Sequence, residues 1–212
     1  MSLSMVFLLL GGLGMFLYGM KLMSDGLEQV AGNRMRRILE VLTTNRIAGL
    51  LVGIGVTMVI QSSSATTVMI VGFVNAGLMT LLQAAGVIMG ANIGTTVTAQ
   101  IIAFNLSDIA PFILFAGMIL TVFLKKRLLN RIGHIILGFG ILFVGLGLMS
   151  DAMKPLQENE AFRNFLINFK NPIIGVLIGA IFTAVIQSSS ASVGILQALA
   201  MNGLIGLDSA VF

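Results

Sequence analysis

The chain contains 212 residues, of which 57% are hydrophobic and 9% are charged, and its formal net charge is +4. Soluble domains carry about 25% charged residues, and the mean hydropathy of this chain is +1.05. This composition excludes a soluble enzyme, a disordered tail and a nucleic-acid-binding module, and the absence of Cys excludes disulfides and thiolate metal sites. It predicts an all-α integral membrane protein.

The first predicted element is a membrane span from Met5 to Met23, whose one charged residue, Lys21, lies close enough to its end to reach the interface. No Lys or Arg precedes Met5 and no small-residue cleavage site follows the apolar run, so we interpret it as an uncleaved span and not as a signal peptide. Residues Ser24 to Arg46 form an amphipathic, charged run, which we expect to lie in the membrane surface.

The next apolar stretch, from Ile47 to Thr80, is too long for one span of about 20 residues and too short for two. Its middle is cut by the polar tetrad Gln61-Ser62-Ser63-Ser64. Irregular polar backbone at membrane depth is tolerated only inside protein or beside a water-filled cavity. We therefore predict a re-entrant hairpin of two half-helices with this tetrad at its tip.

Two full spans are predicted after the first hairpin. They cover Gln83–Phe104 and Ile109–Leu124, and the turn between them contains no Lys or Arg. Residues 125–133 are rich in Lys and Arg and are predicted to form a basic loop on the cytoplasmic side.

The rest of the chain repeats the earlier order of elements. A span is predicted over His134–Ser150, a mixed-charge surface segment over Asp151–Asn171 and a second re-entrant hairpin over Pro172–Gly206. The second hairpin is also cut in its middle, by Gln187-Ser188-Ser189-Ser190.

The two halves carry one pattern at positions 126 apart. Gln61 matches Gln187, and Met23-Ser24-Asp25 matches Met149-Ser150-Asp151. Three predicted spans separate the copies, and an odd number of crossings makes the repeats inverted. We therefore predict a first repeat over 1–124, the basic loop over 125–133 and an incomplete second repeat over 134–212. Inverted repeats with broken helices that meet near the membrane midplane are the architecture of secondary transporters.

The basic residues predict the orientation of the chain. Lys and Arg favour the cytoplasmic side, and they are concentrated after the first span and in residues 125–133. We expect a multi-pass protein of the cell membrane, inner or plasma, with its N-terminus outside. The segment Asp151–Asn171 would then be external although it carries Lys154, Arg163 and Lys170.

The two polar tips have the composition of a binding site for a small anion and a cation. We expect the free N–H groups of Ser62 to Ala65 and of Ser188 to Ala191 to face one point, which favours an anion. The side-chain carbonyls of Gln61 and Gln187, with the carbonyls that end the preceding half-helices, suit sodium. Because the tips contain no charged residue, a bound cation would compensate the charge of the anion, and this need would couple the two.

A third polar cluster, Gly90 to Thr96 with Thr98 and Gln100, lies in the span after the first hairpin. It is predicted to supply further sodium ligands or to line the transport path. Its counterpart would begin at position 216, so we expect a second repeat that is truncated at its C-terminus. Glycine pairs spaced by four residues, Gly49/Gly53 and Gly86/Gly90, are predicted to allow close helix packing.

These motifs resemble those of the type II sodium/phosphate cotransporter family and its bacterial relatives. The motifs are QSSSATT at Gln61–Thr67, QSSSAS at Gln187–Ser192 and GANIGTT at Gly90–Thr96. The resemblance covers nearly the whole chain and implies sodium-coupled symport of inorganic phosphate by alternating access, with Na+ as the coupling ion.

The resemblance nominates the Gln, Ser and Thr residues of the two QSSS motifs as site residues, and the N–H groups of the tips and the third polar cluster add the others. For phosphate they are Ser62, Ser63, Ser64, Ala65, Ser188, Ser189, Ser190 and Ala191. For sodium they are Gln61, Thr66, Thr67, Asn92, Thr95, Thr96, Gln187 and Ser192.

Two other functions stay open on the residues alone. Neutral, Ser-rich tips would also suit a sodium-coupled transporter of sulfate or a carboxylate, and an incomplete second repeat would suit a phosphate-binding membrane protein that does not transport. The partners expected are phosphate, sodium and the lipid bilayer, with no nucleic acid and with homodimer formation left open. An enzyme is not expected, since the one His, His134, is remote in sequence from the tips and no G-x-S-x-G motif is present.

Overall fold

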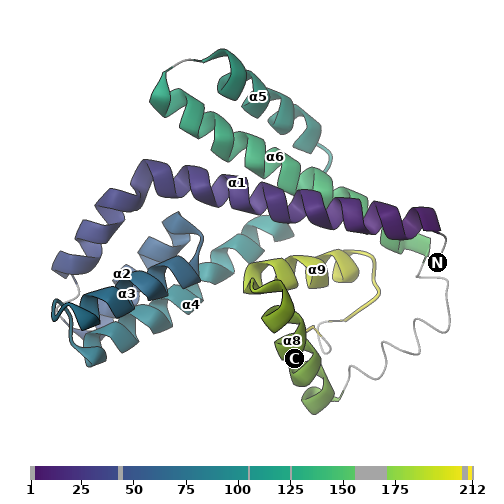
Figure 1. Ribbon diagram of the computed structural model, residues 1–212. Coiled ribbons are helices and arrows are strands. Elements are labelled where there is room, and N and C mark those ends of the chain that lie inside the picture. The colour runs from purple at the N-terminus through teal and green to yellow at the C-terminus, as the bar shows by residue number, and fades with distance from the viewer. Residues whose placement is uncertain are drawn as a thin grey trace. The chain divides into compact units, whose positions relative to one another are not determined.

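The computed structural model describes residues 3–42, 45–104, 106–124, 126–155, 171–206 and 210–211, and within them its regular structure is helical (Figure 1). The helices are α1 (Leu3–Leu42), α2 (Arg46–Ile60), α3 (Ser63–Asn75), α4 (Leu81–Ala103), α5 (Ala110–Phe123), α6 (Arg127–Met153), α8 (Pro172–Ile186) and α9 (Ser189–Met201). The chain divides into two compact units. One contains Met1–Met20, Ile102–Phe112 and Phe139–Phe212, and the other contains Lys21–Ile101 and Ile113–Gly138.

Three helices among the described residues are long and apolar enough to cross a membrane. They are the Leu3–Ala31 part of α1, α4 and α6. The expected full span over 109–124 is shorter in the structure, because α5 begins at Ala110 and ends after 14 residues. At 1.5 Å per residue it is about 21 Å long, less than a hydrocarbon core of about 30 Å.

α1 is one continuous helix of 40 residues. The charged run that begins at Ser24 was expected to form a separate element in the membrane surface, but the structure continues the helix through it. Its apolar side chains Met35, Ile38 and Leu39 pack against protein, so this face is covered by the hairpin and not by lipid. The sequence contains no Pro here, and charge alone does not end a helix.

α6 also begins earlier than expected. Arg127 to Gly133, predicted as most of a basic loop, form its first turns. Of the predicted surface segment Asp151–Asn171, residues 156–170 lie outside the described residues.

Each polar tetrad breaks an apolar stretch into two contacting helices, as the sequence predicts. α2 contacts α3, and α8 contacts α9. Asn45 caps the start of α2 by accepting a 2.8 Å hydrogen bond from the N–H of Ala48. Asn171 does the same for α8, whose first turn contains Pro172. We call α2 with α3 the first hairpin, and α8 with α9 the second hairpin.

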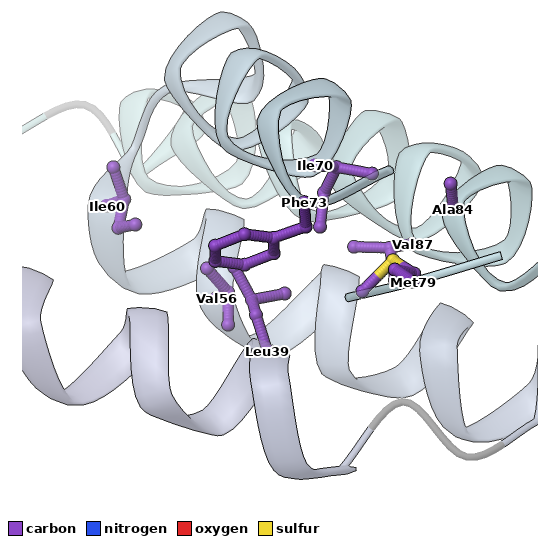
Figure 2. Close-up of a cluster of buried hydrophobic side chains, with 8 residues drawn as sticks. All are labelled: Leu39, Val56, Ile60, Ile70, Phe73, Met79, Ala84 and Val87. Carbon is purple, nitrogen blue, oxygen red and sulfur yellow. The ribbon is translucent and has the colours of Figure 1, made fainter. Parts of the chain in front are cut away.

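One hydrophobic cluster packs the first hairpin against α1 and α4 (Figure 2). Its buried members come from α1, α2, α3, the turn after α3 and α4, and they are Leu39, Val56, Ile60, Ile70, Phe73, Met79, Ala84 and Val87. Leu39 and Ile70 are fully buried. The first hairpin therefore has a packed core that reaches Ile60, the residue directly before the polar tip.

Glycines let α4 approach α2 closely, which confirms the prediction from their spacing. A Cβ atom on Gly94 would lie 2.6 Å from the carbonyl oxygen of Ile54 and 3.0 Å from Cβ of Thr57. A Cβ on Gly90 would collide with the carbonyl oxygen of Leu50. The backbones of α2 and α4 are thus in direct contact beside the tip of the first hairpin.

Candidate functional site

The two hairpin tips share one unusual backbone conformation. Gln61 has φ 59° and ψ 21°, and Gln187 has φ 58° and ψ 23°. Among the described residues they are the only non-glycine residues with positive φ. A left-handed residue other than Gly is uncommon and unfavourable. The backbone N–H of each glutamine closes the preceding helix. It donates a 2.7 Å bond to the carbonyl of Thr57 in the first tip and a 2.8 Å bond to the carbonyl of Thr183 in the second.

The side chain of each glutamine folds back onto the helix that it ends. Nε2 of Gln61 donates to the carbonyl of Met58, and Nε2 of Gln187 donates to the carbonyl of Ala184. Oε1 of Gln61 also accepts a hydrogen bond from the hydroxyl of Thr98 on α4. The Gln61 amide therefore links the first tip to the span that follows it.

The serine directly after the glutamine in each tetrad is a helix cap. Oγ of Ser62 accepts a 3.2 Å bond from the N–H of Ala65, and Oγ of Ser188 accepts a 3.2 Å bond from the N–H of Ala191. The expectation that the N–H groups of Ala65 and Ala191 are free is therefore wrong, because these cap side chains already satisfy them.

The remaining serines begin the second helix of each hairpin. Ser63 and Ser64 open α3, and Ser189 and Ser190 open α9. The first N–H groups of a helix have no partner within it, so these positions offer backbone donors beside their hydroxyls. Thr67, one turn further along α3, is half-buried.

A chain of hydroxyls crosses the interior of each hairpin. Thr57 donates a 3.0 Å bond to the hydroxyl of Thr66, which donates in turn to the carbonyl of Ser62. Thr57 and Thr66 are both fully buried. The second hairpin repeats the same chain from Thr183 to Ser192 and on to the carbonyl of Ser188. Thr66 and Ser192, nominated as sodium ligands, are thus engaged in joining the two helices of their hairpins.

Thr57 and Thr183 also belong to the tips, although the sequence did not lead us to predict them there. Both lie four positions before the glutamine, so their recurrence 126 positions apart was the available signal.

The third polar cluster reaches the first tip through a residue that was not among the nominated ligands. Thr98, buried on α4, makes the contact with Gln61. Asn92 and Thr96 are exposed. The hydroxyls of Thr95 and Thr96 donate to carbonyls of their own helix, at 3.0 Å and 2.7 Å. The structure therefore brings Thr98 to the tip in place of these three residues.

One further residue at the first tip comes from α1. The hydroxyl of Ser24 donates a 2.9 Å hydrogen bond to the carbonyl of Ile60, the last residue of α2. Its counterpart Ser150 has a different partner, since it accepts a 2.8 Å bond from Nδ2 of Asn202 at the end of α9. The repeat of Met-Ser-Asp at 23–25 and 149–151 marked Ser24 in the sequence, but did not identify its partner.

Each tip places opposite helix ends beside one another. The first helix ends there with carbonyl groups, which carry partial negative charge, and the second begins there with N–H groups, which carry partial positive charge. The tip residues themselves are uncharged. Such a site can accept a small cation at its carbonyl end and donate hydrogen bonds to an oxyanion at its N–H end.

A family model described as Na+/Pi-cotransporter matches residues 15–151 and 146–212 of the chain. YjbB of Escherichia coli (strain K12), provisionally named as an inorganic phosphate export protein, is 29% identical over 204 residues, which are 96% of this chain and 38% of that protein. YqeW of Bacillus subtilis (strain 168) is 32% identical over 92% of this chain and 64% of its own length. The sodium-dependent phosphate transport protein 2A of Rattus norvegicus is 40% identical over 98 residues, which are 45% of this chain and 15% of that protein.

The chain thus spans about two fifths of the length of YjbB and somewhat less than two thirds of that of YqeW. No solved structure matches it.

Proposed function

Because the chain belongs to the Na+/Pi-cotransporter family, we propose that it moves inorganic phosphate across the cell membrane together with sodium, and that the two hairpin tips bind these ions. The observation that carries this proposal is the geometry common to both tips, in which a left-handed glutamine ends one helix and a capping serine begins the next. Relatives whose names state phosphate export and sodium-dependent phosphate transport support the same substrate.

Phosphate binds at the N–H end of each tip in this proposal. Ser63 and Ser64 of the first tip contribute hydroxyls and first-turn N–H groups, and Ser189 and Ser190 contribute the same donors in the second. Ser62, Ser188, Ala65 and Ala191 shape the site through the caps that they form. Neutral donors of this kind hold an oxyanion without an ion pair.

Sodium binds at the carbonyl end of each tip. Oxygen donors suit this cation, and Gln61, Gln187 and the last carbonyls of α2 and α8 supply them. Thr98 joins this set through its contact with Gln61, while Thr67, Asn92, Thr95 and Thr96 would serve along the path to the site. Thr66 and Ser192 act through the hydroxyl chains that hold each hairpin closed.

The coupling of sodium to phosphate follows from the absence of charge in the tips. An oxyanion in a largely dehydrated, neutral site is costly to bind unless a cation accompanies it. Each ion therefore raises the affinity for the other, and the coupling is reciprocal.

The two hairpins are re-entrant in this proposal, and their tips meet near the midplane of the membrane as parts of an inverted repeat. At 13 to 15 residues, the four hairpin helices are each shorter than a bilayer core. Alternating access would expose the shared site to one side and then to the other. The N-terminus lies outside, and phosphate and sodium move in the same direction as symported ions.

The proposal is tested by thermal unfolding of the purified chain in detergent, with phosphate titrated in sodium buffer or in choline buffer. A ligand present at 100 times its Kd stabilises the folded chain by about 2.7 kcal/mol. We expect stabilisation by phosphate in sodium only. Stabilisation by sulfate with equal strength would favour a broader oxyanion substrate, and no response to phosphate in sodium would contradict the proposed site. Uptake or efflux of labelled phosphate by proteoliposomes with a sodium gradient then separates transport from binding alone.

A further inference from the structure

Ser24 makes an unusual hydrogen bond for a serine inside a helix. Such a serine ordinarily bonds the carbonyl four residues earlier in its own helix or points to solvent. The Ser24 hydroxyl instead donates at 2.9 Å to Ile60, which is 36 residues further along the chain, and the bond is partly buried. It therefore connects α1 directly to the last residue before the tip of the first hairpin.

With this bond, both polar groups of one peptide are hydrogen-bonded. The peptide that joins Ile60 to Gln61 has its carbonyl bonded to Ser24 and its N–H bonded to the carbonyl of Thr57. Rotation of this peptide changes ψ of Ile60 and φ of Gln61 together, and Gln61 occupies the left-handed conformation. With both polar groups held, the direction in which the Gln61 side chain leaves the backbone is fixed as well.

We propose that Ser24 is a positioning residue for the cation end of the first tip. By holding the Ile60–Gln61 peptide, Ser24 sets the orientation of the Gln61 amide and of the last carbonyls of α2. This role rests on the proposed function, in which sodium binds at that end of the tip. Ser24 acts on the helix end that presents carbonyls, whereas phosphate binds at the end that presents N–H groups. Loss of the Ser24 hydroxyl therefore weakens sodium binding directly and leaves the phosphate donors in place.

The second repeat supplies a matched control. Ser150 stands in the same Met-Ser-Asp context, but it bonds Asn202, which ends α9 at the opposite end from the tip residue Ser188. It also lines a cavity of about 450 Å³ with polar neighbours that include Asp151 and Lys154. We therefore expect removal of the Ser150 hydroxyl to leave the conformation of both tips unchanged.

The experiment compares Ser24→Ala, Ser24→Thr, Ser150→Ala and the unsubstituted chain by thermal unfolding in detergent. Sodium is titrated at saturating phosphate, and phosphate is titrated at saturating sodium. For Ser24→Ala we expect the sodium midpoint to rise roughly fivefold, as for the loss of one neutral hydrogen bond, with the phosphate midpoint unchanged. Ser24→Thr keeps the hydroxyl and should restore the sodium midpoint, and Ser150→Ala should match the unsubstituted chain.

A second measurement needs no ligand. Hydrogen exchange of the backbone N–H of Gln61 in the sodium-free chain should accelerate roughly fivefold in Ser24→Ala and stay unchanged in Ser150→Ala. If Ser24→Ala does not fold, Ser24→Cys, whose thiol is a weak donor of similar shape, should give the same changes.

The inference is overturned if Gln61 exchange does not change, if sodium and phosphate midpoints shift equally, or if Ser150→Ala has the same effect. An unsubstituted chain that shows no sodium-dependent response to phosphate would contradict the proposed function, and the exchange measurement would then decide the role of Ser24 by itself.

Discussion

Gln61 and Gln187 each combine two tasks that a single residue rarely performs. Each adopts the left-handed conformation that ends a helix, for which Gly is the favoured residue, and each uses its side-chain amide to cap a carbonyl of that helix. A glycine would relieve the backbone but would remove the amide. The retention of glutamine at both tips, despite its backbone cost, is consistent with a need for the amide.

Replacements of Gln61 separate these two tasks. Gln61→Ala should be less stable than Gln61→Gly by about 1 kcal/mol, because Ala retains a Cβ at φ 59°. Both variants should lose the sodium-dependent response to phosphate, because both lose the amide. Chemical unfolding and ligand titration measure the two effects, and an Ala variant as stable as the Gly variant would contradict the backbone argument.

The hydroxyl chain in each hairpin has a structural role that is separable from ion binding. Thr57→Val removes the bond to Thr66 but leaves Thr66 bonded to the carbonyl of Ser62. We expect a loss of about 1 kcal/mol in unfolding free energy and a sodium midpoint like that of the unsubstituted chain. Thr183→Val should behave in the same way in the second hairpin, and an increase in stability in either variant would argue against the hydroxyl chain.

The contact between α2 and α4 determines whether Thr98 can reach Gln61. This contact depends on glycines, since Cβ atoms on Gly53, Gly90 and Gly94 would all collide with backbone atoms of the facing helix. Backbone atoms cannot move aside as the end of a flexible side chain can. The position of the third polar cluster relative to the first tip is therefore determined by glycines, which carry no side chain.

Gly90→Ala should weaken this contact. We expect a loss of about 1–3 kcal/mol in unfolding free energy and, because α4 moves away from α2, a weaker sodium response. Gly55→Ala is the matched control on α2, since a Cβ there would have no atom within 4 Å. In that variant alanine should leave stability unchanged or raise it by up to about 1 kcal/mol. Equal effects at the two glycines, measured by thermal unfolding, would contradict glycine-mediated packing.

The sequence predicted where the helices of each hairpin break, but not which distant residues contact the first tip, and the difference has a physical reason. The helix breaks at Gln61 and Gln187 were visible because polar residues interrupt apolar runs, and this signal is local. The partners Ser24 and Thr98 lie 36 and 37 positions from theirs, and no local pattern specifies such pairs. Hydropathy also misplaced the boundaries of α1 and α6, because charge marks the end of an apolar run and not the end of a helix.

The proposed function requires two tips from different halves of the chain to form one site. A double-mutant cycle tests this requirement directly. If both glutamines contact one pair of ions, the losses of phosphate affinity in Gln61→Ala and Gln187→Ala should not add, and the double variant should bind about as poorly as the weaker single variant. Additive losses would indicate two independent sites, and unchanged affinity in both single variants would exclude the shared site.

The uncharged composition of the tips has a consequence for the response to acidity. Amides, hydroxyls and backbone groups do not change protonation near neutral pH, whereas inorganic phosphate changes its own charge there. Any pH dependence of phosphate binding near neutral pH should therefore come from the titration of phosphate and not from the tips. A site built in this way selects among the protonation states of its substrate without titrating itself.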